Sequence, residues 1–404
     1  MTEGFKKKAL KIIDKAAFSF FVILVFFFPI SGALIEISFT GILFCFLLKL
    51  VFKHPDLNSF KAFFKDRINL SALVFFICIG LSLFASGPLL AKSLRAWISK
   101  WGEGVLLFYF ARVFLDRKKV KQLLAVMVVS TFLVGINGLW QKITGIGFLR
   151  RFAMVRTDNF LGVRSSFNHF NNFATFLAVM FFIVNAFFLN LRKWQLKAGL
   201  ILLSLLIVVN LCFTYSRGAW VAFICGCLCV VMFSASKKHK WIFLLVGVIF
   251  ITGMFTVPVL RSRVLFSFQK SGDAGRFVMW NAAVAMFKES PLIGKGLGTF
   301  MLYLPAYTEL GYQYAHNCYF QILAECGALG LLSFLWFLGE IIGRSYAKLK
   351  RNPDVLFVGL FAGLLTFLTH SFFDSQLYFL KLSIFFWLLA SFIAVVLMPE
   401  KNIR

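Results

Sequence analysis

The sequence predicts an all-α, polytopic membrane protein, and the prediction rests on its composition and its hydropathy pattern. Of the 404 residues, 60% are hydrophobic and 15% are charged, and the mean hydropathy is +0.85. A soluble domain needs more polar surface than this composition supplies. The apolar residues also gather in runs close to the roughly 20 residues with which a helix crosses a bilayer.

We expect about twelve transmembrane helices, which make residues 1–404 a single integral membrane domain. The apolar runs are Phe18–Ile30, Ala33–Phe52, Leu70–Phe84, Leu94–Phe114, Val120–Trp140, Phe170–Asn190, Ala198–Thr214, Ala219–Phe233, Trp241–Val259, Asn317–Gly343, Val355–Phe373 and Leu377–Met398. The lysine-rich start before the first run is similar to the charged region of a signal peptide. No clear small-residue cleavage site follows it, so we interpret the first run as an anchor of the mature protein.

The distribution of lysine and arginine predicts the orientation. The strongly basic segments are the N-terminus, Lys49–Arg67, Arg112–Lys121, Arg192–Lys197, Lys237–Lys240, Arg344–Arg351 and Lys401–Arg404. They fall on alternate loops and therefore on one side, which the positive-inside rule makes the cytoplasm. Both termini are then cytoplasmic, and the agreement among these segments supports twelve spans. Topology and anionic lipid headgroups explain most of the net charge of +27, and we find no nucleic-acid-binding motif.

Two loops on the other side are long, namely Gln141–His169 and Leu260–His316. The second, residues 260–316, is large enough for a small subdomain and contains a predicted amphipathic helix at about residues 274–288. Its capping residues are Ser271, Gly272 and Asp273. Its apolar stripe consists of Phe277, Trp280, Val284 and Phe287. This helix is too short to span a bilayer and is expected along the membrane surface. We interpret the following Gly294–Thr299 as a turn, since its spacing does not match a Walker loop.

The outer loops carry basic residues that oppose the charge rule. They are Arg150, Arg151, Arg156 and Arg164 beside Asp158, then Arg217 in a tight turn, then Arg261, Arg263, Lys270, Arg276, Lys288 and Lys295. The planar donor fork of arginine suits phosphate, so an anionic phosphate ligand is the leading hypothesis. We assign that role to Arg164, Arg217 and Arg276. For Arg150, Arg151, Arg261 and Arg263 we favour lipid headgroups or solvent as the partners.

Arg217 and Arg276 are favoured by their positions. Arg217 lies between two apolar helices, beside Gly218, which permits a close approach at the membrane boundary. A structural arginine whose charge extends to the interface is the alternative. Arg276 falls in the first turn of the predicted surface helix, where exposed amides and the helix dipole favour an anion.

His316, at the end of the second long loop, is a candidate general base because an imidazole can take a proton near neutral pH. A structural histidine is the alternative. The outer loops contain no closely spaced pair of acids, so a metal is not expected and arginines would compensate the charge of a ligand. Polar residues inside the apolar segments could instead mark an ion or substrate path, so a transporter or flippase is a rival hypothesis. A structural role is the alternative, for example pairing of Asp374 with Lys381. These residues are Glu36, Glu325, Glu340, His370, Asp374 and Lys381.

These residues also carry a family resemblance. The motifs, in order, are Ser216-Arg217-Gly218-Ala219-Trp220, Gly275-Arg276 with Trp280, Pro291 to Gly298, and His316-Asn317 through Glu325-Cys326-Gly327-Ala328-Leu329-Gly330. From about Arg164 to Gly330 the chain resembles the O-antigen ligase and polymerase superfamily. Arg164, followed by Phe167, Asn168, Asn171 and Asn172, is similar to its upstream motif. The family usually has a proline beside those asparagines, where this chain has His169-Phe170.

The resemblance implies a GT-C-like, metal-independent, inverting glycosyltransferase of the bacterial inner membrane, with a periplasmic site and neither metal nor nucleotide cofactor. In the ligases, a glycan on undecaprenyl pyrophosphate is transferred to a sugar hydroxyl of lipid A–core. Carried onto this chain, His316 would deprotonate or orient the acceptor hydroxyl, and Arg217 and Arg276 would hold the pyrophosphate and stabilise its charge. The residues expected to contact substrate are Arg217, Arg276, Arg164, Tyr215, Trp280 and Asn317.

Other members of the same superfamily are the nearest alternatives, namely polysaccharide polymerases and protein O-oligosaccharyltransferases. The latter often carry an extra periplasmic domain, which is not apparent here, so a ligase is favoured. A transporter should concentrate its polar groups near the bilayer midplane, often with broken helices. The expected partners are the lipid-linked glycan, the lipid A–core acceptor and membrane lipids, and no nucleic acid.

Overall fold

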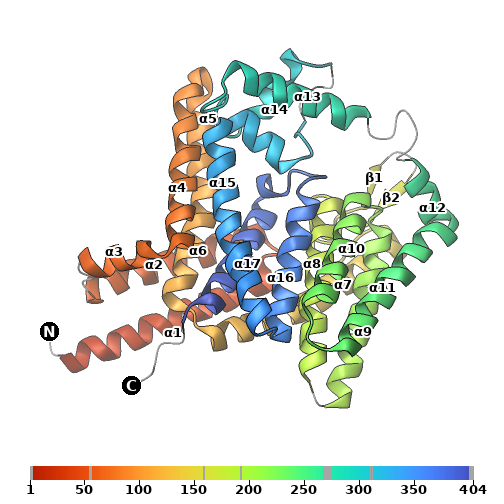
Figure 1. Ribbon diagram of the computed structural model, residues 1–404, viewed down its shortest axis with the longest axis horizontal. Helices are drawn as coiled ribbons and strands as arrows, with labels where there is room; N and C mark the ends of the chain where they lie inside the picture. Colours follow the sequence, from red (N-terminus) through yellow and green to blue (C-terminus); the bar gives the residue numbers. More distant parts are fainter. Residues whose placement is uncertain are drawn as a thin grey trace.

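The computed structural model describes residues 3–53, 57–157, 160–191, 193–266, 274–309, 311 and 313–399. Within them the chain is mainly helical (Figure 1). The first nine helices are α1 Glu3–Phe27, α2 Gly32–Lys53, α3 Leu57–Lys65, α4 Arg67–Leu81, α5 Leu90–Arg95, α6 Glu103–Phe114, α7 Arg117–Thr144, α8 Phe170–Asn190 and α9 Trp194–Phe213. The others are α10 Arg217–Phe233, α11 Lys237–Thr256, α12 Pro258–Leu265, α13 Ala274–Glu289, α14 Phe300–Tyr303, α15 Cys318–Arg351, α16 Val355–His370 and α17 Leu380–Leu397.

One short antiparallel hairpin lies between α7 and α8 in the described part of the chain. Its strands are β1, Val155–Thr157, and β2, Phe160–Gly162, and Val155 pairs with Gly162. Several residues of the sequence-based predictions lie outside the described part of the chain: Asp158, Arg192, Lys270, the capping residues Ser271, Gly272 and Asp273, and Lys401–Arg404.

The prediction of a helical membrane protein is confirmed. Eight described helices are long and apolar enough to cross a membrane, and α10 and α16 are shorter apolar helices. Each of the predicted runs contains helix, but the total of twelve spans stays a prediction. Among the differences from the predicted boundaries, two change the local structure, and one of these two creates the candidate site.

The fourth apolar run does not begin as a regular helix. Between α4 and α6 the backbone passes through 3-10 turns, the six-residue α5 and a π-helical segment, Ala96–Gly102. Gly87 has a φ of +48°, and Pro88 follows it. A left-handed glycine followed by a proline cannot continue an α-helix, so the run is interrupted at this point.

The second difference concerns the connection between α16 and α17. The apolar runs predicted only three residues between these helices, whereas α16 ends at His370 and α17 begins at Leu380. The resulting loop has a 3-10 turn at Gln376–Tyr378 and buries Asp374, Ser375 and Gln376. Hydropathy alone did not reveal this polar loop because phenylalanine and leucine surround it.

Helices α8, α16 and α17 form the centre of the molecule (Figure 1). Nearly every described residue of α17 is buried, and α8 packs against both α16 and α10. A helix that is apolar around its whole circumference is expected in such a central position. These helices carry the polar loops at their ends on a rigid base.

Helix α13 lies across one end of the long helices (Figure 1). It buries Met279, Ala282, Ala283 and Met286 in a small core of its own, which includes Ala324 of α15. The predicted stripe is therefore wrong by about one position, and its first member, Phe277, is 59% exposed. Small and flexible side chains let α13 approach α15 closely, while the aromatic residues flank the contact.

The glycine-rich turn, Gly294–Thr299, packs against a break in α15 at Gly327. At Gly327 the backbone has a φ of +63°, and the amide of Ala328 donates to the carbonyl of Pro291 at 2.8 Å. On the other side of the break, the amide of Gly296 donates to the carbonyl of Glu325 at 2.9 Å. A Cβ atom at Gly327 would overlap the backbone of the turn. The predicted turn is confirmed, and it joins α13 to the outer part of α15.

Charged groups meet at the far end of α15. We define the arginine–carboxylate cluster as Asp66, Arg67, Arg112, Glu340 and Arg344. Asp66 accepts hydrogen bonds from Arg112 and, at 2.8 Å, from Arg344. Three of the basic segments predicted to share one side of the membrane supply Asp66, Arg67, Arg112 and Arg344, so the contacts agree with that grouping.

Candidate active site

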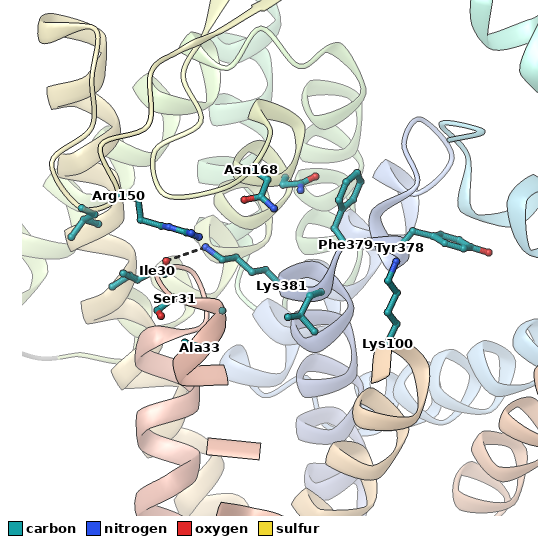
Figure 2. Close-up of a pocket in the computed structure, with 13 residues that line it drawn as sticks. Ile30, Ser31, Ala33, Lys100, Arg150, Asn168, Tyr378, Phe379 and Lys381 are labelled. Atoms are coloured by element: carbon teal, nitrogen blue, oxygen red, sulfur yellow. Dashed lines mark hydrogen bonds between the residues drawn. The ribbon is translucent and has the colours of Figure 1, made fainter. Parts of the chain in front are cut away.

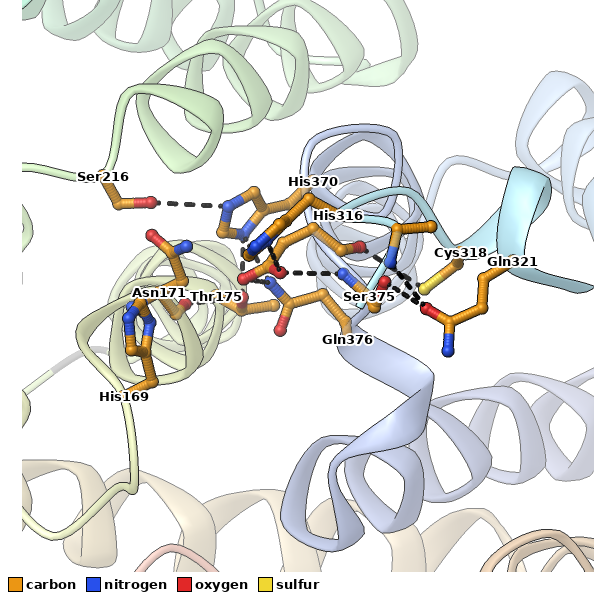
Figure 3. Close-up of polar contacts among 12 residues, drawn as sticks. His169, Asn171, Thr175, Ser216, His316, Cys318, Gln321, His370, Ser375 and Gln376 are labelled. Carbon is orange, nitrogen blue, oxygen red and sulfur yellow. Dashed lines mark hydrogen bonds and ion pairs between the residues drawn. The ribbon is translucent and has the colours of Figure 1, made fainter. Parts of the chain in front are cut away.

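Four loops converge at the end of the helices opposite the arginine–carboxylate cluster. They precede α8, α10 and α15 and connect α16 with α17. Their central contact joins Nδ1 of His316, which Figure 3 labels, to Oδ1 of Asp374 at 2.9 Å. Residues 58 positions apart therefore form a histidine–carboxylate dyad. A carboxylate that binds Nδ1 orients the ring and makes Nε2 the nitrogen that can accept a proton.

Main-chain and side-chain contacts fix this dyad on both sides. The amide of Cys318 donates to the carbonyl of Ser371 at 2.8 Å. Gln321 Oε1 accepts from the Ser375 hydroxyl at 2.6 Å and from the Ala315 amide at 3.2 Å. The start of α15 and the α16–α17 loop are thus tied together directly on either side of the dyad.

His316 adopts an uncommon backbone conformation. Its φ is +49°, in the left-handed region that non-glycine residues rarely enter. Trp280 of α13 donates from Nε1 to the carbonyl of Ala315 at 3.1 Å, and Asn317 caps α15 by accepting from the amides of Tyr319 and Phe320. Such strain persists only where surrounding contacts determine the conformation. Trp280 and Asn317, predicted to contact substrate, have positioning contacts in this structure.

Asp374 is buried, with 2% of its surface exposed, yet it is held as a carboxylate. Burial alone would raise the pKa of Asp374, but the hydrogen bond with His316 and the charges of His316, His370 and His169 hold it well below its usual range. A buried acid kept ionised by neighbouring imidazoles is a common way to stabilise a protonated histidine.

His370 forms a second layer below the dyad. Its Nδ1 lies 2.7 Å from the Thr175 hydroxyl, and its Nε2 lies 3.4 Å from the Ser216 hydroxyl (Figure 3). Gln376 reaches both His370 Nδ1, at 3.4 Å, and Asp374 Oδ2, at 3.3 Å. His370 therefore connects the α16–α17 loop with α8 and with the residue that precedes Arg217.

His169 completes what we call the histidine cluster, defined as His169, His316, His370 and Asp374. It caps α8 by accepting from the Asn171 amide at 3.2 Å. Burial lowers the pKa of His169, the charges of His316 and Arg164 lower it further, and Asp374 opposes them. The four side chains thus act on one another electrostatically.

Arg217 is the first residue of α10, directly beside this cluster. Its guanidinium lies 5.7 Å from the centre of the Phe266 ring. A Cβ atom on Gly218 would lie 2.5 Å from Cβ of Phe373 and 3.0 Å from the His370 ring, so glycine lets the start of α10 approach the α16–α17 loop. The side chain of Ser216 does not cap α10, and the amides of the first turn face the same region.

Arg276 approaches from α13, in whose first turn it lies. Its positive charge acts on His370, which places it in the electrostatic field of the histidine cluster. The structure therefore brings together His316, Arg217 and Arg276, which the sequence selected from segments up to 99 positions apart (316 − 217).

Arg164 is committed to its own loop. Its Nε donates to the carbonyl of Ala153 at 2.7 Å, its NH1 donates to the carbonyl of Asn168 at 3.0 Å, and its guanidinium lies over the Phe152 ring. These contacts shape the loop before α8. Tyr215 is buried against Phe160, and its carbonyl accepts from Arg263, so both residues stabilise the turn before Arg217.

The suggested pairing of Asp374 with Lys381 is wrong. Lys381 Nζ donates instead to the carbonyls of Pro29, Ile30 and Ser166, at 2.8–3.2 Å. The start of α17 directs this side chain towards the turn between α1 and α2, away from the dyad. Asp374, His370 and His169 are the members of the cluster to which sequence reasoning gave no catalytic role. The signal that could have found two of them was the presence of ionisable residues in apolar segments.

Groups of three or more His, Cys, Asp and Glu side chains arranged to hold a metal ion do not occur among the described residues. The charge compensation available for an anion in this region comes from Arg217 and Arg276, with the amides at the starts of α10 and α13. What the arrangement offers chemically is a base oriented by a carboxylate beside cations that can receive negative charge.

This fold and site define a class, namely a polytopic helical membrane protein in which a histidine–carboxylate dyad and arginines meet at one end of the helices. Residues 201–335 match the family described as O-antigen ligase. The chain is also 22% identical, over 317 residues, to the O-antigen ligase of Salmonella typhimurium (strain LT2), which covers 74% of this chain and 75% of that protein. The predicted resemblance is confirmed, and the segment that matches the family contains Arg217, Arg276 and His316.

Proposed function

We propose that the protein is an O-antigen ligase-type glycosyltransferase. It would move a glycan from undecaprenyl pyrophosphate to a sugar hydroxyl of lipid A–core, on the periplasmic side of the bacterial inner membrane with both termini in the cytoplasm. The observation that carries the proposal is the His316–Asp374 dyad beside Arg217 and Arg276. Base and anion-binding groups meet there, as a transfer from a pyrophosphate donor requires.

The proposed step is a single displacement. The acceptor hydroxyl oxygen forms a bond to the anomeric carbon while the bond from that carbon to the pyrophosphate oxygen breaks. His316 Nε2 takes the hydroxyl proton, and Asp374 stabilises the imidazolium through Nδ1. Attack on the face opposite the leaving group inverts the anomeric configuration.

Arg217 and Arg276 would receive the leaving pyrophosphate. Preorganised donors aimed at developing negative charge lower the barrier because they need no reorganisation during the step. Two arginines supply the charge compensation that a metal ion supplies in other pyrophosphate enzymes, so the reaction is proposed to be metal-independent. The activated donor is the energy source, and no nucleotide is required.

A polymerase or protein O-oligosaccharyltransferase would use the same groups and differ only in the acceptor. A transporter is the rival of another class, and the break in α15 is a feature that transporters share. Here, however, the break is filled by the backbone of Pro291–Gly296, while the histidine cluster lies at the helix ends. This arrangement favours the transferase.

The decisive experiment is reconstitution of the purified protein with undecaprenyl-pyrophosphate glycan and lipid A–core, with and without EDTA. We expect glycan transfer to lipid A–core in both conditions, with the opposite anomeric configuration in the product. Transfer only onto a second lipid-linked glycan would indicate a polymerase. Loss of transfer with EDTA would contradict the arginine mechanism, and glycan movement across vesicles without bond formation would identify a transporter.

A further inference from the structure

A polar cavity lies on the side of the α16–α17 loop that faces the turn between α1 and α2. It is a cavity of 610 Å³ bounded by the turn between α1 and α2, the loop before β1 and the start of α17 (Figure 2). Asn168 and Asn172 line it, and these residues flank His169 and Asn171 of the candidate active site. The cavity and the histidine cluster are therefore back to back across the start of α8.

Three cationic side chains line this cavity, namely Lys100, Arg150 and Lys381. Figure 2 shows the Arg150 guanidinium next to the Lys381 ammonium, and the charge of Arg150 acts on that of Lys381. Among the described lining residues, none is an aspartate or a glutamate. Like charges held together without an acid in the wall favour an anionic occupant.

The local backbone and side-chain contacts direct these three cationic groups towards the cavity. Lys100 lies in the π-helical segment Ala96–Gly102, and such segments are frequent at functional sites. Lys381 is fixed by three carbonyls, so it supplies charge from the wall, whereas Arg150 reaches in from an exposed loop. The side-chain oxygen of Asn172, 2% exposed, is buried without a hydrogen-bond partner among the described residues. This acceptor oxygen suits a hydroxyl group of an occupant, whereas the cations suit its negative charge.

A transferase that joins two lipid-linked substrates needs two binding spaces that meet at the reacting atoms. Arg217 and Arg276 lie on the α10 and α13 side of the α16–α17 loop. The cavity lies on the α1–α2 side of the same loop, as its lining by Tyr378 and Lys381 indicates. If the first substrate is assigned to the arginines, the cavity remains for the second substrate.

We propose that this cavity, through Arg150 and Lys100 with Lys381 in its wall, binds a phosphate group of the acceptor glycolipid and so positions its sugar hydroxyl for His316. The assignment rests on the proposed function. It also changes the interpretation of Arg150, which the sequence alone had favoured as bound to lipid headgroups or solvent.

The kinetic test varies the acceptor at a fixed donor concentration in lipid nanodiscs. Arg150→Gln and Lys100→Gln should each raise the KM for the phosphorylated acceptor about tenfold, the effect of one lost charge-assisted hydrogen bond, and leave the KM for the donor unchanged. Arg261→Gln is the matched control, since it removes an exposed arginine on α12 outside the cavity. A rise in the donor KM, or an equal effect of Arg261→Gln, would overturn the assignment.

A dephosphorylated acceptor tests the chemistry of recognition. With this acceptor, wild type and Arg150→Gln should have the same KM, because the group that Arg150 contacts is absent. A tenfold difference that persists would show that Arg150 acts through something other than phosphate and would refute the proposal.

Direct binding separates this inference from the proposed function. Binding of phosphorylated acceptor to the full-length protein, measured without donor by native mass spectrometry, should weaken about tenfold in Arg150→Gln. If wild type transfers no glycan but shows this Arg150-dependent binding, the proposed reaction fails and the glycolipid site stands. Equal displacement by phosphatidylglycerol, or displacement by millimolar inorganic phosphate, would assign the cavity to a general headgroup or to free phosphate and overturn the proposal.

Discussion

The arginine–carboxylate cluster and the histidine cluster lie at opposite ends of the same helices and use charge differently. In the first, Asp66 and Glu340 form ion pairs with Arg67, Arg112 and Arg344. In the second, Asp374 pairs with a histidine, while Arg217 and Arg276 approach from other elements. An arginine bound to a carboxylate holds helices together, whereas arginines that approach a histidine–carboxylate dyad from other elements are suited to an anionic ligand.

The largest expected effect is on the histidine cluster itself. His316→Asn should lower the initial rate of glycan transfer by about 10²- to 10⁴-fold, because the general base is lost. Asparagine is the appropriate replacement since it adopts the left-handed backbone conformation of His316 readily. Because the buried Asp374 carboxylate would lose its hydrogen-bond partner, the rate is measured per folded molecule, with the unfolding temperature in detergent recorded for each variant. Full activity of this variant would mean that another group is the base.

At the other end, Asp66→Asn should destabilise the protein by about 3 kcal/mol, because Arg112 would keep its buried charge without a counter-charge. Asparagine preserves the cap that Asp66 provides to α4. The measurements are denaturant unfolding and the transfer rate per folded molecule, which should change by less than about twofold. A large loss of turnover with normal stability would break the distinction between the two clusters.

Arg217→Ala and Arg276→Ala should each reduce turnover by about 100-fold, since each removes a donor to the developing negative charge. Lysine at either position should restore only part of the rate, because it lacks the planar fork. Arg67→Ala is the control from the arginine–carboxylate cluster, where the Arg67 side chain is 67% exposed, and it should change turnover by less than about twofold. Equal losses in all three variants would remove the contrast.

Asp374→Asn should lower turnover by about 10- to 100-fold, the effect of losing a hydrogen bond to a charged partner. Since Asp374 acts through His316, the double variant with His316→Asn should be no slower than His316→Asn alone. Single- and double-variant rates under the same conditions make this comparison. Multiplicative losses would show that Asp374 contributes independently of His316.

The smallest effect should come from Glu289, an exposed acid near the end of α13. Hydrogen bonds from Lys295 and Tyr307 hold the pKa of Glu289 below its ordinary value of about 4.3, so their stabilisation is present above that pH and is lost as the pH falls through the lowered pKa. Limited proteolysis should reveal slightly faster cleavage near α13 in Glu289→Gln than in wild type at pH 7 and a smaller difference at pH 3. A difference as large at pH 3 as at pH 7 would exclude the ion pair as its cause.

The sequence was sufficient for the helices because a span of about 20 apolar residues leaves the backbone few alternatives. It also selected Arg217, Arg276 and His316, since basic residues on the outer side and a lone histidine stand out from their neighbours. Asp374 was ambiguous because its partner is 58 residues away and Lys381 is much closer in sequence. Only the packing of α15 against the α16–α17 loop resolves that choice.

Other features depended on geometry that one-dimensional patterns do not contain. The buried stripe of α13 was misplaced because large aromatic residues outweigh alanine in hydropathy, whereas close helix packing prefers alanine. Arg164 was selected as an anion-binding residue, and the sequence did not show that two of its five N–H donors bind carbonyls of its own loop. The cavity at Arg150 was not predictable either, since its walls come from five separate parts of the chain.

The contact between the glycine-rich turn and α15 determines which substitutions this part of the protein can accept. Main-chain atoms meet there, so the position of the first half of α15, and of His316 before it, does not depend on the exposed side chains of α13. Exposed residues of α13 can therefore be substituted without moving His316. A single added methyl group at Gly294 or Gly327 would overlap backbone on the opposite side and displace both elements.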